Sequence, residues 1–163
     1  MLAEAASDGW LGTRADAGKH RGDYRRIIDE SRCKMGEVLV VDDSKTIRMV
    51  LRKILRELGY EVCEAADGKE ALKVMEAEKS TVKLVLADWN MPVMNGMDLL
   101  KQLRRDPELS SLIVIMVTTE TEVMNMVAAL EAGANEYVMK PFTKEILKDK
   151  LELVGIHPLA GPR

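Results

Sequence analysis

Apolar runs recur along this chain, and segments with helical spacing separate them. The runs begin near residues 38, 60, 82, 112 and 136, and they read VLVV, YEVCEA, VKLVLA, LIVIMV and EYVM. Three of the runs consist almost entirely of Val, Ile, Leu and Met, which is typical of strands buried on both faces, as parallel strands are. Because such strands need helices on both faces of their sheet, this feature restricts the chain to an α/β fold.

The segments between the runs carry helical patterns. One helical face combines residues spaced at i, i+3, i+4, i+7, i+8 and i+11: Ile47, Val50, Leu51, Ile54, Leu55 and Leu58. Ser44 can cap this helix and Gly59 can end it. Further helices are predicted over GKEALKVMEAEK, GMDLLKQLRR, ETEVMNMVAALEA and TKEILKDKLELV. Five alternations predict a three-layer α/β sandwich with a five-stranded parallel sheet, five helices and right-handed crossovers.

Residues 1–34 differ in composition from the rest of the chain. They are rich in Gly, Ala, Asp and Arg and show no sustained apolar period, whereas regular patterning begins at Met35. Two interpretations of residues 1–34 stay open, a disordered N-terminal extension and a mis-assigned start. We expect one domain over residues 35–156 and a C-terminal tail over 157–163.

Charge and hydropathy exclude several classes of function. The formal net charge is −3, which gives no electrostatic case for binding nucleic acid or an anionic membrane. The longest apolar run, 112–117, is too short to span a bilayer, so no membrane insertion is expected. Charged residues such as Glu4 and Asp8 stand where a signal peptide needs an apolar stretch. Since Cys33 and Cys63 lack CxxC spacing, we predict a cytoplasmic location.

Chemically versatile residues end four of the five predicted strands. They are Asp42 and Asp43 after the first, Asp88 after the third, Thr118 and Thr119 after the fourth, and Lys140 after the fifth. In open parallel sheets, ligands bind beyond this carboxyl edge. If the first and third strands are neighbours, three carboxylates converge and raise each other's pKa, which indicates a compensating cation. Oxygen ligands favour a hard ion such as Mg²⁺.

The motifs that the sequence lacks narrow the chemistry at this edge. The sequence has no GxxxxGK[ST] for a P-loop and no GxGxxG after the first strand. Its only histidines, His20 and His157, lie outside the patterned core, which disfavours Ser-His-Asp and Cys-His hydrolases. The chemistry left for this edge is the attack of an aspartate on phosphorus, which forms an acyl phosphate. A lysine, a hydroxyl and Mg²⁺ would stabilise the transferring group.

Four segments, in order and with suitable spacing, resemble the receiver domains of two-component response regulators. They read VLVVDDSKTIR, LVLADWNMPVMNG, IMVTTETE and EYVMKPFT, and the resemblance covers about residues 35–156. The second, third and fourth segments most resemble the stand-alone chemotaxis (CheY-like) type. The resemblance implies a flavodoxin-like fold with strand order 2-1-3-4-5. It also implies a phosphorylation-dependent switch with weak self-phosphorylation and autodephosphorylation, rather than a dedicated enzyme.

The resemblance further implies a role for each residue at the carboxyl edge. Asp88 would be the phosphoacceptor. It would ligate Mg²⁺, or Mn²⁺ as the alternative cation, together with Asp43 and the backbone carbonyl of Asn90. Asp42 would act on the metal through a bound water. Thr119 stands where chemotaxis regulators often have Ala, which bears on the lifetime of the phosphoryl group.

A second set of residues is implied to sense the phosphoryl group and transmit its presence. Lys140 and Thr118 would bind the phosphoryl group, and Tyr137 would turn inward as Thr118 shifts. A cis peptide is expected at 140–141. The implied output face consists of Tyr137, Phe142, Thr143 and Lys150.

Three functions remain open from the sequence. The leading one is a monomeric single-domain response regulator that takes phosphate from a histidine kinase. Since only HPLAGPR follows the last predicted helix, we expect output through a protein partner, such as a flagellar motor switch protein. A Mg²⁺-dependent phosphatase or nuclease-like enzyme on a related fold is the alternative, although Asp88 lacks the Asp-x-Asp pattern of such enzymes. A degenerate receiver used only for docking is disfavoured by the full acid set.

Overall fold

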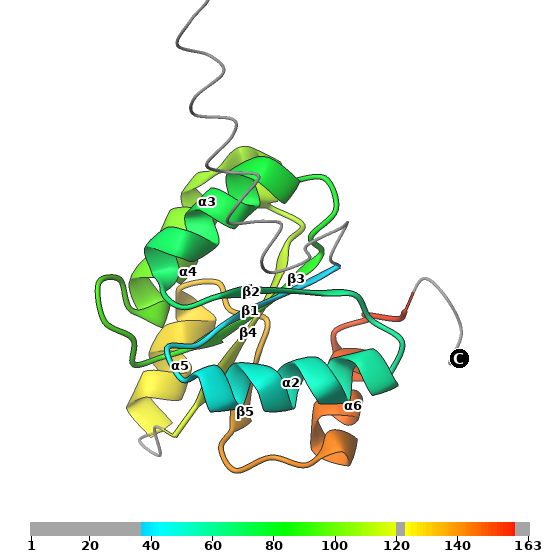
Figure 1. Ribbon diagram of the computed structural model, residues 1–163. Helices are drawn as coiled ribbons and strands as arrows, with labels where there is room; N and C mark the ends of the chain where they lie inside the picture. The colour runs from blue at the N-terminus through cyan, green and yellow to red at the C-terminus, as the bar shows by residue number, and fades with distance from the viewer. Residues whose placement is uncertain (1–36, 120–122, 159–163) are drawn as a thin grey trace, which may run out of the picture. The chain divides into compact units, whose positions relative to one another are not determined.

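The computed structural model describes residues 37–119 and 123–158 of the chain. The predictions for residues 1–34 and for most of the tail lie outside these ranges. Among the described residues, strands and helices alternate as the sequence predicted (Figure 1). The strands are β1 (Val38–Val41), β2 (Val62–Ala65), β3 (Leu84–Asp88), β4 (Ile113–Thr118) and β5 (Glu136–Met139). The helices are α2 (Lys45–Glu57), α3 (Gly68–Glu78), α4 (Gly96–Arg105), the 3₁₀ turn η1 (Pro107–Leu109), α5 (Val123–Glu131) and α6 (Lys144–Leu153).

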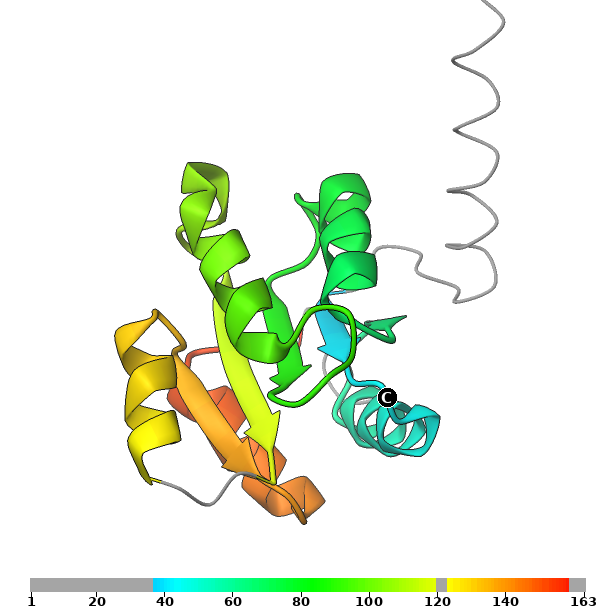
Figure 2. The same ribbon diagram turned by 90° about the vertical axis from the view of Figure 1, so that its left-hand side faces the viewer.

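The five strands form one parallel sheet in the order β2-β1-β3-β4-β5, which confirms the expected topology. Helices α2 and α6 cover one face, and α3, α4 and α5 cover the other (Figures 1 and 2). In the register of the sheet, Val41 pairs with Ala87 and Asp88 pairs with Val117. The carboxyl ends of β1, β3 and β4 therefore lie side by side.

The core forms because the central strands carry apolar side chains on both faces. Strands β1 and β3 are buried along their whole length. Against α2 and α6 the core packs Leu51, Leu55, Leu147 and Leu151, all almost fully buried. One detail of the predicted helical face is wrong, because Val50 lies at the rim of the stripe and stays 43% exposed. In the part of the chain that the structure describes, no helix combines the length and apolar character needed to cross a bilayer.

Side-chain caps begin the helices at the same edge of the sheet where the polar residues lie. Ser44 Oγ accepts from the Ile47 amide at 3.3 Å, which confirms the predicted cap of α2. The side chains of Asp67, Asn95 and Thr143 cap α3, α4 and α6 in the same way. Gly59 ends α2 with a φ of +95°, a left-handed conformation that glycine adopts without steric penalty. These caps thus fix the loops that lead from β1, β2, β3 and β5 into α2, α3, α4 and α6.

Candidate functional site

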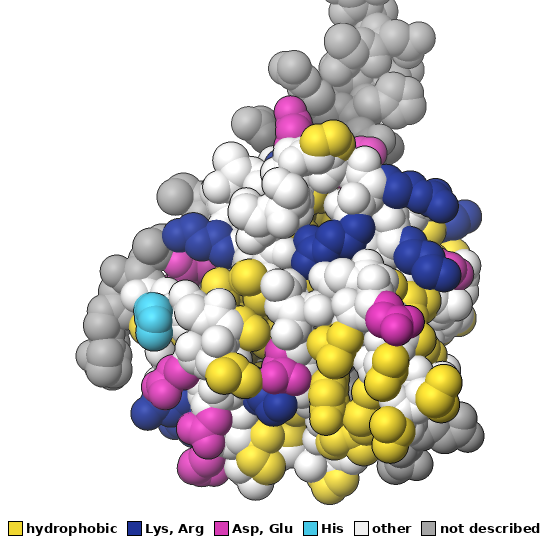
Figure 3. Space-filling view, turned by 180° about the vertical axis from the view of Figure 1, so that it is seen from behind, with side chains coloured by type: hydrophobic (Ala, Val, Ile, Leu, Met, Phe, Trp, Pro, Cys, Tyr) yellow, Lys and Arg dark blue, Asp and Glu magenta, His cyan; other side chains and the backbone are white. Residues whose placement is uncertain are grey.

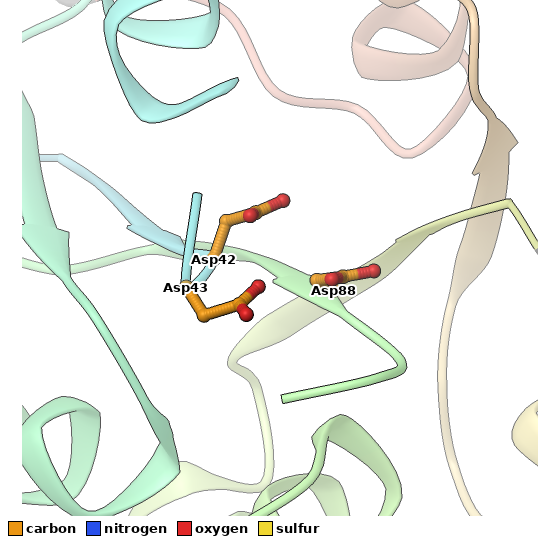
Figure 4. Close-up of side chains that lie close together, drawn as sticks. All are labelled: Asp42, Asp43 and Asp88. Carbon is orange, nitrogen blue, oxygen red and sulfur yellow. The ribbon is translucent and has the colours of Figure 1, made fainter. Parts of the chain in front are cut away.

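Three carboxylates meet at the carboxyl edge of the sheet. Asp42 and Asp43 follow β1, and Asp88 is the last residue of the neighbouring β3. One carboxylate oxygen from each of the three lies within 4.8 Å of the others. Figure 4 shows the three side chains projecting from the two strand ends into the same space. The structure therefore brings together the acids that the sequence predicted to converge.

The three acids differ in exposure and in partners. Asp42 is only 1% exposed, and both of its oxygens have partners: Oδ1 accepts from the Ser44 amide at 2.8 Å and Oδ2 accepts from Lys140 Nζ at 2.7 Å. Asp88 is 8% exposed, whereas Asp43 is exposed to solvent. Asp42 is thus fixed by contacts within the protein, while the Asp43 carboxylate faces solvent.

Lys140 connects the acids from the fifth strand end. Its Nζ lies 2.7 Å from Asp42 Oδ2 and 3.4 Å from Asp88 Oδ1, and its side chain is 13% exposed. Its amide donates to the carbonyl of Thr118 at 2.8 Å, which joins the ends of β4 and β5. The expected cis peptide between Lys140 and Pro141 is present. The shorter contact to Asp42 was not predicted from the sequence.

Asp88 is the electrostatically strained member of the cluster. Burial raises the pKa of the Asp88 carboxyl; the charge of Lys140 opposes this rise, and the charge of Asp42 adds to it. A divalent cation would relieve the repulsion among the acids, and carboxylate oxygens are the ligands that hard cations take. Asp42, Asp43 and Asp88 therefore fit a divalent cation.

The loop after β3 contains a feature that sequence reasoning missed. A Cβ placed on Gly96 would lie 2.1 Å from the carbonyl oxygen of Asp88, and the Gly96 amide donates to the Trp89 carbonyl at 3.0 Å. Asn90, whose carbonyl was predicted as a metal ligand, is exposed in this loop. The missed signal was the Asn-Gly pair at the start of the helix, where glycine permits close backbone approach.

Arg48 is a second residue that the sequence interpretation missed. Its guanidinium Nη1 donates to the carbonyl oxygens of Asp42 at 2.7 Å and Asp43 at 3.4 Å. The available signal was its position near the start of α2, because helical side chains point back toward the N-terminus of their helix. Arg48 therefore reaches the loop that carries the acid pair.

The predicted switch and output residues lie on β4, β5, α6 and the loop between β5 and α6. Thr118 ends β4 and is 3% exposed, and Tyr137 is half-buried on the neighbouring β5. Lys150 Nζ lies 5.0 Å from the centroid of the Tyr137 ring. Phe142 packs partly against the core, and Thr143 caps α6, so both also have structural roles.

Comparison with known proteins gives consistent results. A family model described as the response regulator receiver domain matches residues 38–152. The chain is 47% identical over 119 residues to chemotaxis protein CheY1 of Helicobacter pylori, covering 72% of this chain and 95% of that protein. It is 44% identical over 117 residues to the CheY homolog of Campylobacter jejuni, covering 71% and 89%. The solved structure of chemotaxis protein CheY4 of Vibrio cholerae is 37% identical, with a TM-score of 0.66 and coverage of 74% and 98%.

Proposed function

The chain belongs to the response regulator receiver domain family, and we propose that it is a chemotaxis response regulator whose phosphoacceptor is Asp88. The observation that carries the assignment is the position of Asp88. It ends a buried strand, forms one cluster of carboxylates with Asp42 and Asp43, and lies 3.4 Å from the ammonium group of Lys140. The family match and the relatives give no support to the alternative of a phosphatase or nuclease-like enzyme.

The proposed reaction transfers a phosphoryl group from a phosphohistidine of a histidine kinase. An Asp88 carboxylate oxygen forms a bond to phosphorus, the phosphorus–nitrogen bond breaks, and the imidazole leaves and takes up a proton. Asp43, Asp88 and the Asn90 carbonyl would hold Mg²⁺, with Asp42 acting through a water. When bound, this ion would neutralise charge on the phosphoryl oxygens. Mn²⁺ prefers the same oxygen ligands and is the alternative cation.

Lys140 changes partner in this proposal. Before phosphorylation its Nζ lies closer to Asp42 than to Asp88. A phosphoryl group on Asp88 adds charged oxygen acceptors beside the ammonium group. We infer that Lys140 then pairs with a phosphoryl oxygen, while the buried hydroxyl of Thr118 donates to another.

The output is a change in protein binding. The shift of Thr118 would let the half-buried Tyr137 ring turn inward, and the phosphoryl group would select between two packings of the same strand ends. Tyr137, Phe142, Thr143 and Lys150 would present the changed surface to a downstream protein, such as a flagellar motor switch protein. We propose that the regulator acts as a monomer in the cytoplasm.

Phosphate-affinity electrophoresis after treatment with acetyl phosphate tests the proposal. We expect a shifted band in Mg²⁺, none in EDTA, and none for Asp88→Asn. Asp149→Asn, a change at an exposed site on α6, is the matched control and should shift as the wild type does. A shifted band for Asp88→Asn would overturn the assignment, and steady turnover of a phosphomonoester would favour the enzyme alternative.

A further inference from the structure

Arg48 bridges the acid-bearing loop to the edge strand of the sheet. Besides the carbonyls of Asp42 and Asp43, its guanidinium contacts Glu64 on β2, where Nε donates to Oε2 at 3.3 Å. The side chains of Arg48 and Glu64 are 15% and 16% exposed, so water screens these contacts only partly. One guanidinium thus joins α2, β2 and the loop after β1.

We propose that Arg48 is a positioning residue for the divalent cation site. By binding the carbonyls of Asp42 and Asp43 and anchoring on Glu64, it holds the backbone from which the Asp43 carboxylate projects. This inference rests on the proposed function, because it takes the acid cluster to be a site for Mg²⁺.

The two acids depend on Arg48 to different degrees. Asp42 is also held by its own side chain, through Lys140 and the Ser44 amide, and its amide donates to the Ala65 carbonyl at 3.2 Å. The exposed Asp43 carboxylate takes its direction from the backbone, and its carbonyl is one of the two that Arg48 binds. Loss of Arg48 should therefore misplace Asp43 more than Asp42.

A positioning role and a purely electrostatic role predict changes of opposite sign in Mg²⁺ affinity when Arg48 is removed. A guanidinium near a cation site repels the cation, so removing its charge would tighten Mg²⁺ binding if Arg48 acted through charge alone. Removing a group that orients metal ligands weakens binding, by about 10-fold to 100-fold for outer-shell partners of known metal sites. The direction of the change in affinity distinguishes the two roles.

Arg52 provides a matched control one turn further along α2. Its Nη1 lies 2.8 Å from Glu64 Oε1 without hydrogen-bond geometry, so this contact is an ion pair. Arg52 shares the Glu64 partner and the charge of Arg48, and its side chain is more exposed, at 37%. The substitution Arg52→Gln therefore removes the same charge and a contact to Glu64 but leaves the bonds from Arg48 to the loop carbonyls in place.

Titration of Mg²⁺ into the metal-free full chain, followed by Trp89 fluorescence, tests the inference. Trp10→Phe is introduced into every variant so that Trp89 is the single tryptophan. We expect Arg48→Gln to weaken Mg²⁺ affinity about 10-fold, Arg52→Gln to change it less than about 2-fold, and Arg48→Lys to recover part of the loss. Unchanged or tighter binding in Arg48→Gln would overturn the inference.

A metal-free measurement separates this inference from the proposed function. Hydrogen exchange of the Ser44 amide, which donates to Asp42 Oδ1, should speed up in Arg48→Gln and stay near wild type in Arg52→Gln. If the wild type does not respond to Mg²⁺, the cation site fails, while the exchange data still test whether Arg48 holds the loop that carries Asp42 and Asp43. Should Arg48→Gln not fold, Glu64→Gln removes the anchor instead; because loss of its negative charge alone also weakens Mg²⁺ binding, the readout there is the metal-free exchange of the Ser44 amide, which should speed up, and an unchanged exchange rate would refute the positioning role of Arg48.

Discussion

The two halves of the carboxyl edge differ in how tightly the molecule packs them. The half that carries the acids is built on β1 and β3, which are buried throughout, and its helix α4 buries Gly96, Leu99, Leu100 and Leu103. In the other half, Val138 is the buried residue of β5, and Ala129 is the one that α5 buries among the described residues. The acid half is therefore fixed, while the outer part of the other half, on β5 and α5, has less packing to resist movement; β4, which ends in Thr118, is itself buried from Val114 onward.

The surface of α5 makes the contrast visible. This helix leaves four large apolar side chains exposed by 40–74%: Val123, Met124, Val127 and Leu130. Hydrophobic side chains gather at the lower right of Figure 3, on the side where α5 lies. A second arrangement of side chains therefore costs less on the α5 side, which is where the proposed function needs one. Substitutions on the two sides of the sheet edge test this difference in packing.

Gly96→Ala should disrupt the fixed half most severely. Its new Cβ would lie 2.1 Å from the Asp88 carbonyl oxygen, so β3 or α4 must move, and we expect a loss of about 3 kcal/mol in the free energy of unfolding. Gly155→Ala is the matched control, because Gly155 has a φ of +76° but nothing within 4 Å of a new Cβ. It should lose only about 1 kcal/mol. Urea denaturation measures both, and equal losses would contradict the close approach at Gly96.

A pair of leucines compares the two halves directly. Leu99 on α4 is 1% exposed and Leu130 on α5 is 43% exposed. We expect Leu99→Ala to lower the free energy of unfolding by about 3 kcal/mol and Leu130→Ala by about 1 kcal/mol or less. Thermal and urea denaturation of both variants give the comparison. Similar losses would show that α5 is packed as firmly as α4, and the contrast between the halves would fail.

The elements of both halves were predicted from the sequence, for a physical reason. Buried strands and amphipathic helices leave a strong periodic pattern, so β1, β3, α2 and the converging acids were predicted correctly. The cap at Ser44 and the end of α2 at Gly59 were also correct, because local chemistry determines them. The strand order came from resemblance, since parallel strands of similar composition do not reveal their neighbours.

Contacts between distant segments and unusual backbone conformations were beyond the sequence. The Arg48–Glu64 bridge joins residues 16 apart, and the Lys140–Asp42 contact joins residues 98 apart, so no local pattern records either. Val50 was misplaced because helical periodicity does not say how wide a stripe the sheet covers. The roles assigned to Asp88, Thr118 and Tyr137 stay predictions, because their chemistry depends on a phosphoryl group.

The raised pKa of Asp88 predicts a pH dependence of stability in the fixed half. Because burial raises the pKa of this carboxyl above its ordinary 3.8, the folded state holds the proton more tightly than the unfolded state. This contribution to stability is fully present below about pH 3.8 and is lost as the pH rises through the folded pKa. In EDTA, the free energy of unfolding of the wild type should therefore fall relative to that of Asp88→Asn as the pH rises through the folded pKa of Asp88.

Urea denaturation in EDTA between about pH 3.5 and pH 7 measures the difference for each variant. Asp149→Asn, at an exposed site on α6, should follow the wild type across the range. A wild type that instead gained stability relative to Asp88→Asn with rising pH would mean that Lys140 outweighs burial at Asp88. Added Mg²⁺ should reduce the difference, because a bound cation stabilises the ionised carboxylate.

Two valines of nearly equal exposure, Val93 and Val123, compare the loop after β3 with α5. Val93, in the loop after β3, is 71% exposed and has a φ of +70°, whereas Val123 on α5 is 69% exposed and helical. A β-branched residue is strained at positive φ, and asparagine tolerates that conformation. Val93→Asn should therefore raise the free energy of unfolding by about 1 kcal/mol, while Val123→Asn should change it by less than about 0.5 kcal/mol. If Val93→Asn instead destabilised the protein, its side chain would have to make contacts that outweigh the backbone strain, and the fixed half would extend into this loop.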